Sequence, residues 1–244
     1  MKVAVIITGR VDFVSQENFE LNRKLLEGCD IFIHSGKEYK LNSAKLNPVS
    51  IILTENDKFD CLVDTYYKVY KPEMLFLEHK YKDKKHWDGN FERIIQWVRL
   101  EESLSSFNLG KYDVVLKWRT DLPKVSGRVR MFLDEFTNKY DNFQDFFNSK
   151  YNPKYFYMYS DLIFAGSLEN MHKCSFYKRI KDFIGINDKN FSDNSKLLDQ
   201  CDRSAGRFSW LDPKNRNFIN LFCSETAIIL NNLENELVMK SFVK

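Results

Sequence analysis

An almost unbroken run of β-branched residues near the start of the chain is the feature that most limits its fold. Residues 3–7 read VAVII, and the turn Thr8-Gly9-Arg10 closes the run. A short apolar run without polar alternation is typical of a strand buried on both faces, as in a parallel sheet covered by helices. We therefore expect residues 3–7 to be the first strand of such a sheet.

Helical and strand patterns alternate after this first strand. Leucines near helical spacing predict a helix over residues 17–26 that ends at Gly28. Short apolar runs at residues 30–34 and 49–53 predict the second and third strands. Two strand–helix–strand passages at this spacing favour a doubly wound α/β sheet with right-handed crossovers.

The centre of the chain combines the longest predicted helix with the most informative strand. Two adjoining apolar stripes predict a helix from Asn90 that is buried on a wide face and is ended by residues 108–110. Residues 112–118 then predict a strand, and the loop Arg119-Thr120-Asp121 follows it directly.

The second half of the chain is less regular, and its elements are predicted from shorter patterns. Together with the first half, it predicts one α/β domain over residues 1–244, with a mostly parallel, Rossmann-type central sheet flanked by helices. A tightly fused pair of domains would also fit. The expected elements are strands at residues 125–133, 155–159 and 162–165, helices from Leu168 and over residues 224–237, a surface excursion over residues 138–153 and a polar loop over residues 187–217.

Composition and charge exclude several classes of function. The 244 residues include 37 lysines and arginines against 34 acidic residues, and this net charge of +3 is too weak for a broad nucleic-acid-binding surface. Five scattered cysteines without a CxxC pair argue against a zinc knuckle and favour reduced thiols in the cytoplasm. No apolar run reaches the roughly 18 residues of a membrane-spanning helix, and the first run is too short for a signal peptide. We expect a soluble, cytoplasmic protein.

Candidate ligand-binding residues follow from where open α/β sheets bind their ligands. Ligands lie beyond the carboxyl ends of the strands, where backbone amides face outward. That rule selects the turn Thr8-Gly9-Arg10, then His34, then Arg119 with Asp121. No GxGxxG and no GxxxxGK[ST] motif is present, so neither a dinucleotide fingerprint nor a P-loop is expected.

Arg119 and Asp121 are the side chains best suited to a diphosphate ligand. A guanidinium binds two phosphate oxygens by parallel hydrogen bonds, and a neighbouring carboxylate binds a divalent cation or a ribose hydroxyl. Structural alternatives stay open at each position. They are a local Arg–Asp ion pair that only orders the loop, a simple tight turn at Gly9, and a hydrogen-bonded His34 that binds no ligand.

The order of these segments resembles bacterial surface-polysaccharide glycosyltransferases, the WavE-like lipopolysaccharide-synthesis and capsular families with a GT-A type fold. The resemblance covers about two thirds of the chain, and it lies in the order and spacing of short motifs. The matching segments are the first strand with Thr8-Gly9-Arg10, residues 30–34, Gln96, residues 112–122, residues 160–167 followed by Met171, and Ser224-Glu225-Thr226.

The resemblance implies a nucleotide-sugar donor and transfer of the sugar to a hydroxyl of a glycan or lipid-linked glycan acceptor. Residues 1–123 would be the nucleotide-binding half and residues 124–244 the acceptor half. GT-A enzymes usually carry Asp-x-Asp on a central strand to hold a metal, but here Arg119 occupies the first of those positions. Two alternatives therefore stay open: the enzyme depends on Mn²⁺ or Mg²⁺ with Asp121 as a ligand, or it needs no metal.

Sugar transfer with inversion needs a base that accepts the proton of the acceptor hydroxyl. The resemblance and the predicted positions make Asp161 the first candidate and Glu225 the second. Their structural alternatives are a turn-forming Asp161 and a Glu225 that only stabilises the first turn of a helix.

Two other classes of function compete with the transferase. One is a nucleotidyltransferase-like α/β enzyme, which should show a phosphate loop richer in glycine and arginine than Thr8-Gly9-Arg10. The other is a non-catalytic protein that binds a nucleotide-sugar. For the transferase, peripheral contact with the inner face of the membrane stays open.

Overall fold

The computed structural model describes residues 1–55, 58, 85–122, 127–159, 162–174 and 235–243. The chain divides into two compact units, of which the first comprises Met1–Glu55, Val98–Cys174 and Asn232–Lys244 and the second Asn56–Trp97 and Ser175–Asn231. All the strands described below belong to the first unit. The single domain over residues 1–244 stays a prediction, but the sheet takes strands from both of its predicted halves.

One seven-stranded sheet forms the centre of the first unit, with strand order β3-β2-β1-β4-β6-β5-β7. The pairs of β6 with β4 and with β5 are antiparallel, and the other four pairs are parallel. β6 therefore runs against all the other strands, and the predicted α/β class with a mostly parallel sheet is confirmed. The strands are β1 Val3–Gly9, β2 Asp30–Gly36, β3 Ser50–Thr54, β4 Val114–Trp118, β5 Tyr155–Tyr159, β6 Ile163–Gly166 and β7 Val238–Lys240.

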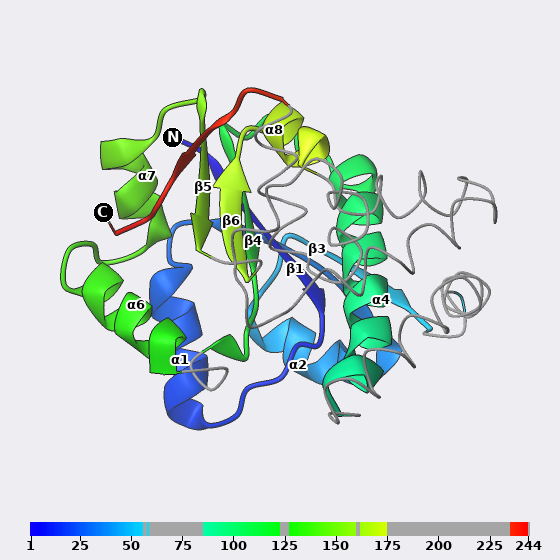
Figure 1. The fold of residues 1–244 in the computed structure, drawn as a ribbon. Helices are drawn as coiled ribbons and strands as arrows, with labels where there is room; N and C mark the ends of the chain where they lie inside the picture. Colours follow the sequence, from blue (N-terminus) through cyan, green and yellow to red (C-terminus); the bar gives the residue numbers. More distant parts are fainter. Residues whose placement is uncertain (56–57, 59–84, 123–126, 160–161, 175–234, 244) are drawn as a thin grey trace, which may run out of the picture. The chain divides into compact units, whose positions relative to one another are not determined.

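Helices flank this sheet, and α1, α6 and α7 gather on one side of it in Figure 1. α1 confirms the helix predicted over residues 17–26: the Ser15 side chain caps it by accepting from the Asn18 N–H, and Gly28 follows its end with φ +77°. The helices are α1 Gln16–Leu25, α2 Lys40–Lys45 after the 3₁₀ turn η1 Lys37–Tyr39, α4 Lys85–Ser106, α6 Gly127–Thr137, α7 Phe143–Lys150 and α8 Leu168–Lys173.

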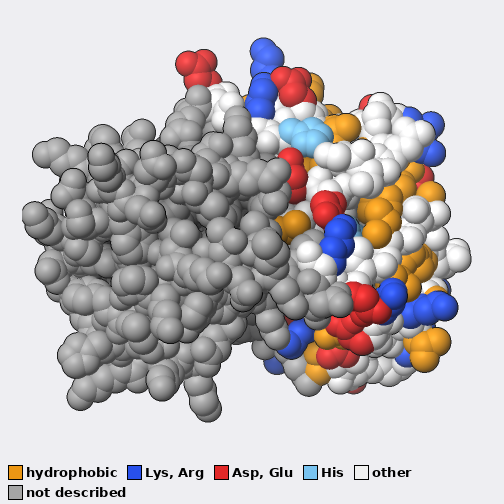
Figure 2. All heavy atoms as spheres, turned by 90° about the vertical axis from the view of Figure 1, so that its right-hand side faces the viewer, with side chains coloured by type: hydrophobic (Ala, Val, Ile, Leu, Met, Phe, Trp, Pro, Cys, Tyr) orange, Lys and Arg blue, Asp and Glu red, His pale blue; other side chains and the backbone are white. Residues whose placement is uncertain are grey.

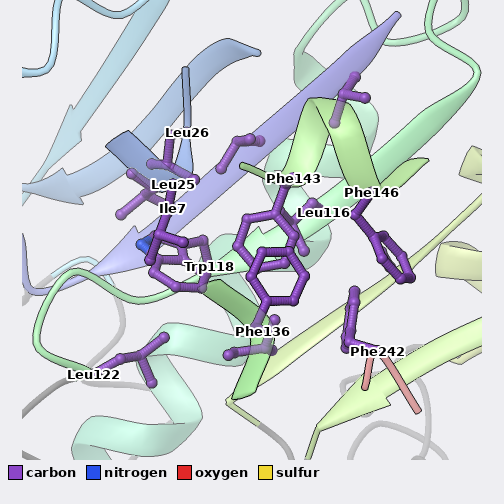
Figure 3. Close-up of a cluster of buried hydrophobic side chains, with 14 of the residues drawn as sticks. Ile7, Leu25, Leu26, Leu116, Trp118, Leu122, Phe136, Phe143, Phe146 and Phe242 are labelled. Atoms are coloured by element: carbon purple, nitrogen blue, oxygen red, sulfur yellow. The ribbon is translucent and has the colours of Figure 1, made fainter. Parts of the chain in front are cut away.

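The face of the sheet covered by α1, α6 and α7 is filled with aromatic side chains (Figure 3). Alternate residues of each strand point to this face, so Ile7 and Trp118 enter the same cluster. The Trp118 ring lies edge-on to Phe143, with 5.2 Å between ring centroids. Phe242, close to the end of the chain, completes the cluster and lies 5.4 Å from the Phe146 ring.

Two predicted elements are wrong, and both lie in this aromatic region. The strand predicted over residues 125–133 is the helix α6, because Phe132, Leu133 and Phe136 are buried at helical spacing. The surface excursion predicted over residues 138–153 contains α7, which buries Phe143, Phe146 and Phe147 against the sheet. Burial of these rings stabilises helices where the local sequence is rich in polar residues.

The remaining predictions fall partly outside the described residues. The strands predicted at residues 155–159 and 162–165 and the helix from Leu168 are confirmed as β5, β6 and α8. Residues 187–217 lie outside the described residues, as does nearly all of the helix predicted over residues 224–237. β7 was not predicted. In the part of the chain that is described, every helix is too short or too polar to cross a membrane.

Candidate functional site

The carboxyl ends of β1 and β4 mark the point where the order of the sheet reverses. The chain passes outward from β1 to β2 and β3 on one side, and β4 lies on the other side of β1. In open α/β sheets the crevice at such a point is the usual ligand site. The parallel register places Ile7 beside Trp118, so the turn after β1 and the loop after β4 leave the sheet as neighbours.

Hydrogen bonds hold these two segments together. The backbone N–H of Asp12 donates to Thr120 Oγ1 over 3.2 Å. From α1, Asn22 Nδ2 donates to the Thr120 carbonyl oxygen over 3.0 Å, and Trp118 Nε1 donates to Asn22 Oδ1 over 2.7 Å. Thr120 is fully buried, so the loop that carries Arg119 is fixed beside the turn after β1.

The turn after β1 depends on Gly9, which has φ +84°. In this left-handed region a side chain is strained and glycine is not. The Gly9 carbonyl oxygen accepts a hydrogen bond of 2.6 Å from Ser35 Oγ, which ties the end of β1 to the end of β2. Thr8 is buried and its hydroxyl finds no hydrogen-bond partner among the described residues, whereas Arg10 is exposed.

Arg119 and Asp121 form a two-pronged ion pair at this edge of the sheet. Arg119 Nε donates to Asp121 Oδ1 over 2.9 Å, and Arg119 Nη2 donates to Oδ2 over 2.6 Å. Both side chains are 28% exposed. The pair matches the ion-pair alternative of the sequence analysis, and a pair this exposed contributes at most about 1 kcal/mol. The same fork of the guanidinium is the one that binds phosphate oxygens.

His34 lies inside the protein, where β2 meets the carboxyl-terminal part of α4. Its side chain is 1% exposed. Nδ1 lies 3.2 Å from the Arg99 carbonyl oxygen and 3.3 Å from Ser103 Oγ. Nε2 lies 3.4 Å from Thr54 Oγ1 and 3.7 Å from a Glu102 carboxylate oxygen. These contacts match the alternative of a hydrogen-bonded histidine, and a role in substrate binding stays a prediction.

Two buried cations near the site were not predicted from the sequence. Arg99 donates from Nε to Thr54 Oγ1 over 3.2 Å and from Nη2 to the Thr54 carbonyl oxygen over 3.3 Å. Burial lowers the pKa of the Arg99 guanidinium, and the charges of Glu38 and Glu102 oppose that shift. Lys117, the last residue but one of β4, donates from Nζ to the Leu162 carbonyl oxygen over 3.2 Å. The sequence does contain a signal for Lys117, because it is the one charged residue in the otherwise apolar strand β4.

A third residue missed by the sequence analysis is Glu38, two positions after the end of β2. An added Cβ at Gly36 would overlap the Glu38 carboxylate, so this side chain folds back over the end of the strand. An acid closely following a strand-ending glycine was the only sequence signal, and it does not reveal that contact.

The candidate bases Asp161 and Glu225 lie outside the described residues, so their roles stay predictions. Among the described residues, no group of three or more His, Cys, Asp or Glu side chains is placed to hold a metal. Both carboxylate oxygens of Asp121 bind Arg119 instead. Metal dependence stays a prediction.

The described cysteines are unsuited to nucleophilic chemistry. Cys29 and Cys174 are free thiols, and burial raises the pKa of each to about 12. At neutral pH both stay protonated, and only the thiolate is a good nucleophile.

The surface and the comparisons with known proteins add little to this site. On the face shown in Figure 2, basic and acidic side chains lie side by side over the described residues, in keeping with the small net charge. Comparison of the chain with protein-family models, with curated proteins and with solved structures finds no match.

Proposed function

We propose that this chain is a glycosyltransferase of GT-A type, which moves a sugar from a nucleotide-sugar to a hydroxyl of a growing surface glycan such as lipopolysaccharide or capsule. The observation that carries the proposal is the placing of Arg119 beside the Gly9 turn, where the order of the sheet reverses. A sheet order of β3-β2-β1-β4-β6-β5-β7 with β6 alone reversed also agrees with the GT-A type fold, which is an argument by analogy.

In the proposed reaction the acceptor oxygen forms a bond to the anomeric carbon of the donor sugar. The bond from that carbon to the phosphate oxygen breaks, and the nucleoside diphosphate leaves with the electron pair. Arg119 would offset the negative charge that develops on the leaving diphosphate. The hydroxyl proton would pass to Asp161, or to Glu225 as the second candidate, if the configuration is inverted.

The location of the enzyme follows from its proposed substrates. Nucleotide-sugars are made in the cytoplasm, so the proposal places the enzyme there. A lipid-linked acceptor would bring it to the inner face of the membrane as a peripheral protein.

Thermal unfolding with nucleotides tests the proposal. A ligand that binds only the folded protein stabilises it, by about 2.7 kcal/mol at one hundred times its Kd. We expect one of UDP, GDP, CDP or CMP, with or without Mn²⁺, to raise the Tm. Arg119→Ala should remove most of that rise, because the phosphates lose their cation.

The matched control is Arg23→Ala. Arg23 is an exposed arginine on α1 that forms a surface ion pair of 3.4 Å with Glu20. This variant should keep the full nucleotide-dependent rise in Tm. The absence of a rise with every nucleotide, or an equal rise in Arg119→Ala and wild type, would contradict the proposal.

A further inference from the structure

One side chain of α1 binds the chain on both sides of Arg119. Asn22 Nδ2 donates to the Thr120 carbonyl oxygen over 3.0 Å, and Asn22 Oδ1 accepts from Trp118 Nε1 over 2.7 Å. Nδ2 also donates to the Asn18 carbonyl oxygen, one turn earlier in the helix, over 2.7 Å. Asn22 is 1% exposed, so these hydrogen bonds lie inside the protein. The backbone of Arg119 is therefore held to α1 through the residue before it and the residue after it.

The partners of Asn22 require an amide at this position. An indole N–H only donates, and a carbonyl oxygen only accepts. The side chain between Trp118 and Thr120 must therefore offer an acceptor to the first and a donor to the second, and asparagine offers both on a short stem. Without Asn22, the indole N–H and the carbonyl oxygen would each lose this partner while buried, which is unfavourable.

The Trp118 ring is a fixed anchor for this network, because it is packed in the aromatic cluster (Figure 3). The ring is fully buried and lies edge-on to Phe143, with 5.2 Å between ring centroids. Interiors packed at this density leave little room for a ring to turn. The indole N–H therefore keeps its direction toward Asn22.

The ion pair of Arg119 with Asp121 does not fix the loop in this way. Both residues belong to the loop, two positions apart, and both are partly exposed. The pair would therefore move with the loop. The hydrogen bonds to Asn22, and the bond of 3.2 Å from the Asp12 N–H to Thr120 Oγ1, instead join the loop to segments far away in the sequence.

We propose that Asn22 is a positioning residue for Arg119, which holds the loop after β4 so that the guanidinium is in place before the diphosphate of the donor arrives. A binding group that is positioned in advance strengthens binding, because the ligand does not have to order it. The inference rests on the proposed function, in which Arg119 binds the diphosphate. Asn22 itself touches no ligand and acts only through Arg119.

Calorimetric titration of the wild type, Asn22→Leu, Arg119→Ala and the double variant tests the inference. The probe is whichever of UDP, GDP or CDP raises the Tm of the wild type most. Leucine has nearly the shape of asparagine but lacks its hydrogen-bonding atoms. Asn22→Leu should weaken the nucleotide about ten-fold when Arg119 is present and not at all in Arg119→Ala, because the two residues act as one unit. A merely structural residue would not show this dependence on Arg119.

Asn142→Ala is the matched control. The Asn142 side chain caps α7, with Oδ1 accepting from the Asp145 N–H over 2.8 Å. Loss of a cap lowers stability, but the affinity for the nucleotide should stay unchanged. Urea unfolding of every variant sets a titration temperature at which all of them are folded.

A second variant covers the case in which Asn22→Leu does not fold. Trp118→Phe keeps an aromatic ring in the cluster and removes the indole N–H that Asn22 accepts. It should weaken the nucleotide about three-fold, again only where Arg119 is present, since the bond from Asn22 to Thr120 remains.

The outcomes separate the two proposals. An unchanged affinity in Asn22→Leu, or an equal loss with and without Arg119, overturns the positioning role and leaves the nucleotide site intact. A loss of affinity in Asn142→Ala as large as that in Asn22→Leu also overturns it, because any loss of stability would then suffice. If the wild type binds none of the three nucleotides, the proposed function fails and the role of Asn22 fails with it.

Discussion

The two faces of the sheet are built from different materials. The face under α1, α6 and α7 packs aliphatic side chains with a group of phenylalanines, whereas the opposite face buries His34, Arg99 and Lys117 among apolar side chains such as Phe32 and Phe164. Burying charged groups costs free energy unless each finds a partner, while burying aromatic rings stabilises the fold directly. The second face therefore depends on hydrogen-bond partners for its buried polar groups, whereas the first depends mainly on apolar packing.

The largest expected effect lies on the aromatic face. Phe136 is fully buried, and its ring lies 4.6 Å from the Phe143 ring. Phe136→Ala should lower the free energy of unfolding by about 3–5 kcal/mol, measured by urea denaturation, because it leaves a cavity in the cluster.

Met131→Ala is the matched control on the same helix. Met131 is 72% exposed, and its loss should change the free energy of unfolding by less than about 0.5 kcal/mol. Equal losses in the two variants would mean that the aromatic face does not supply the stability assigned to it.

The second prediction concerns Asp121, at the edge of the sheet. Asp121→Asn should bind the nucleotide about ten-fold tighter in metal-free buffer, because the carboxylate that competes with phosphate for Arg119 loses its charge. Stability should change by less than about 1 kcal/mol, since the pair is partly exposed. Calorimetry and urea unfolding measure the two effects separately. If Asp121→Asn instead binds the nucleotide more weakly than the wild type, and does so only when Mn²⁺ is present, the result would favour Asp121 as a metal ligand.

The smallest effect is expected on the polar face beneath α4. Ser103 is fully buried, and its Oγ donates to the Arg99 carbonyl oxygen over 2.6 Å. Ser103→Ala should cost about 1 kcal/mol of unfolding free energy, because a single buried hydrogen bond is lost and the His34 ring loses a neighbour.

Ser105→Ala provides the comparison, since Ser105 is exposed on the same helix and donates to Glu101 over 3.3 Å. Its unfolding free energy should match that of the wild type. A cost for Ser103→Ala as large as that for Phe136→Ala would remove the energetic contrast between the two faces.

Six of the seven described strands, β1 to β6, were predicted because each has a local apolar pattern typical of a strand. The β-branched run of β1 is such a case. In α6 the residues Val129, Met131 and Leu133 alternate as a strand would, yet Met131 is exposed and Phe132 is buried. The packing of Phe132 and Phe136 against residues distant in the sequence stabilises the helix. A local sequence pattern does not show that packing.

The candidate site was predicted in part for the same reason. Arg119 and the Gly9 turn meet as the strand-end rule predicts, because adjacent parallel strands end at one edge. The direction of His34 toward α4 depends on Arg99 and Ser103, which lie far away in the sequence. The contact between Glu38 and Gly36 depends on free space above a backbone atom, which a sequence does not display.

The last described residues of the chain have a practical consequence for handling the protein. β7 pairs with β5 along the outer edge of the sheet, Phe242 fills the aromatic cluster, and Lys139 Nζ donates to the Val243 carbonyl oxygen. Truncating these few residues would uncover both an unpaired strand edge and apolar rings, a combination that promotes aggregation.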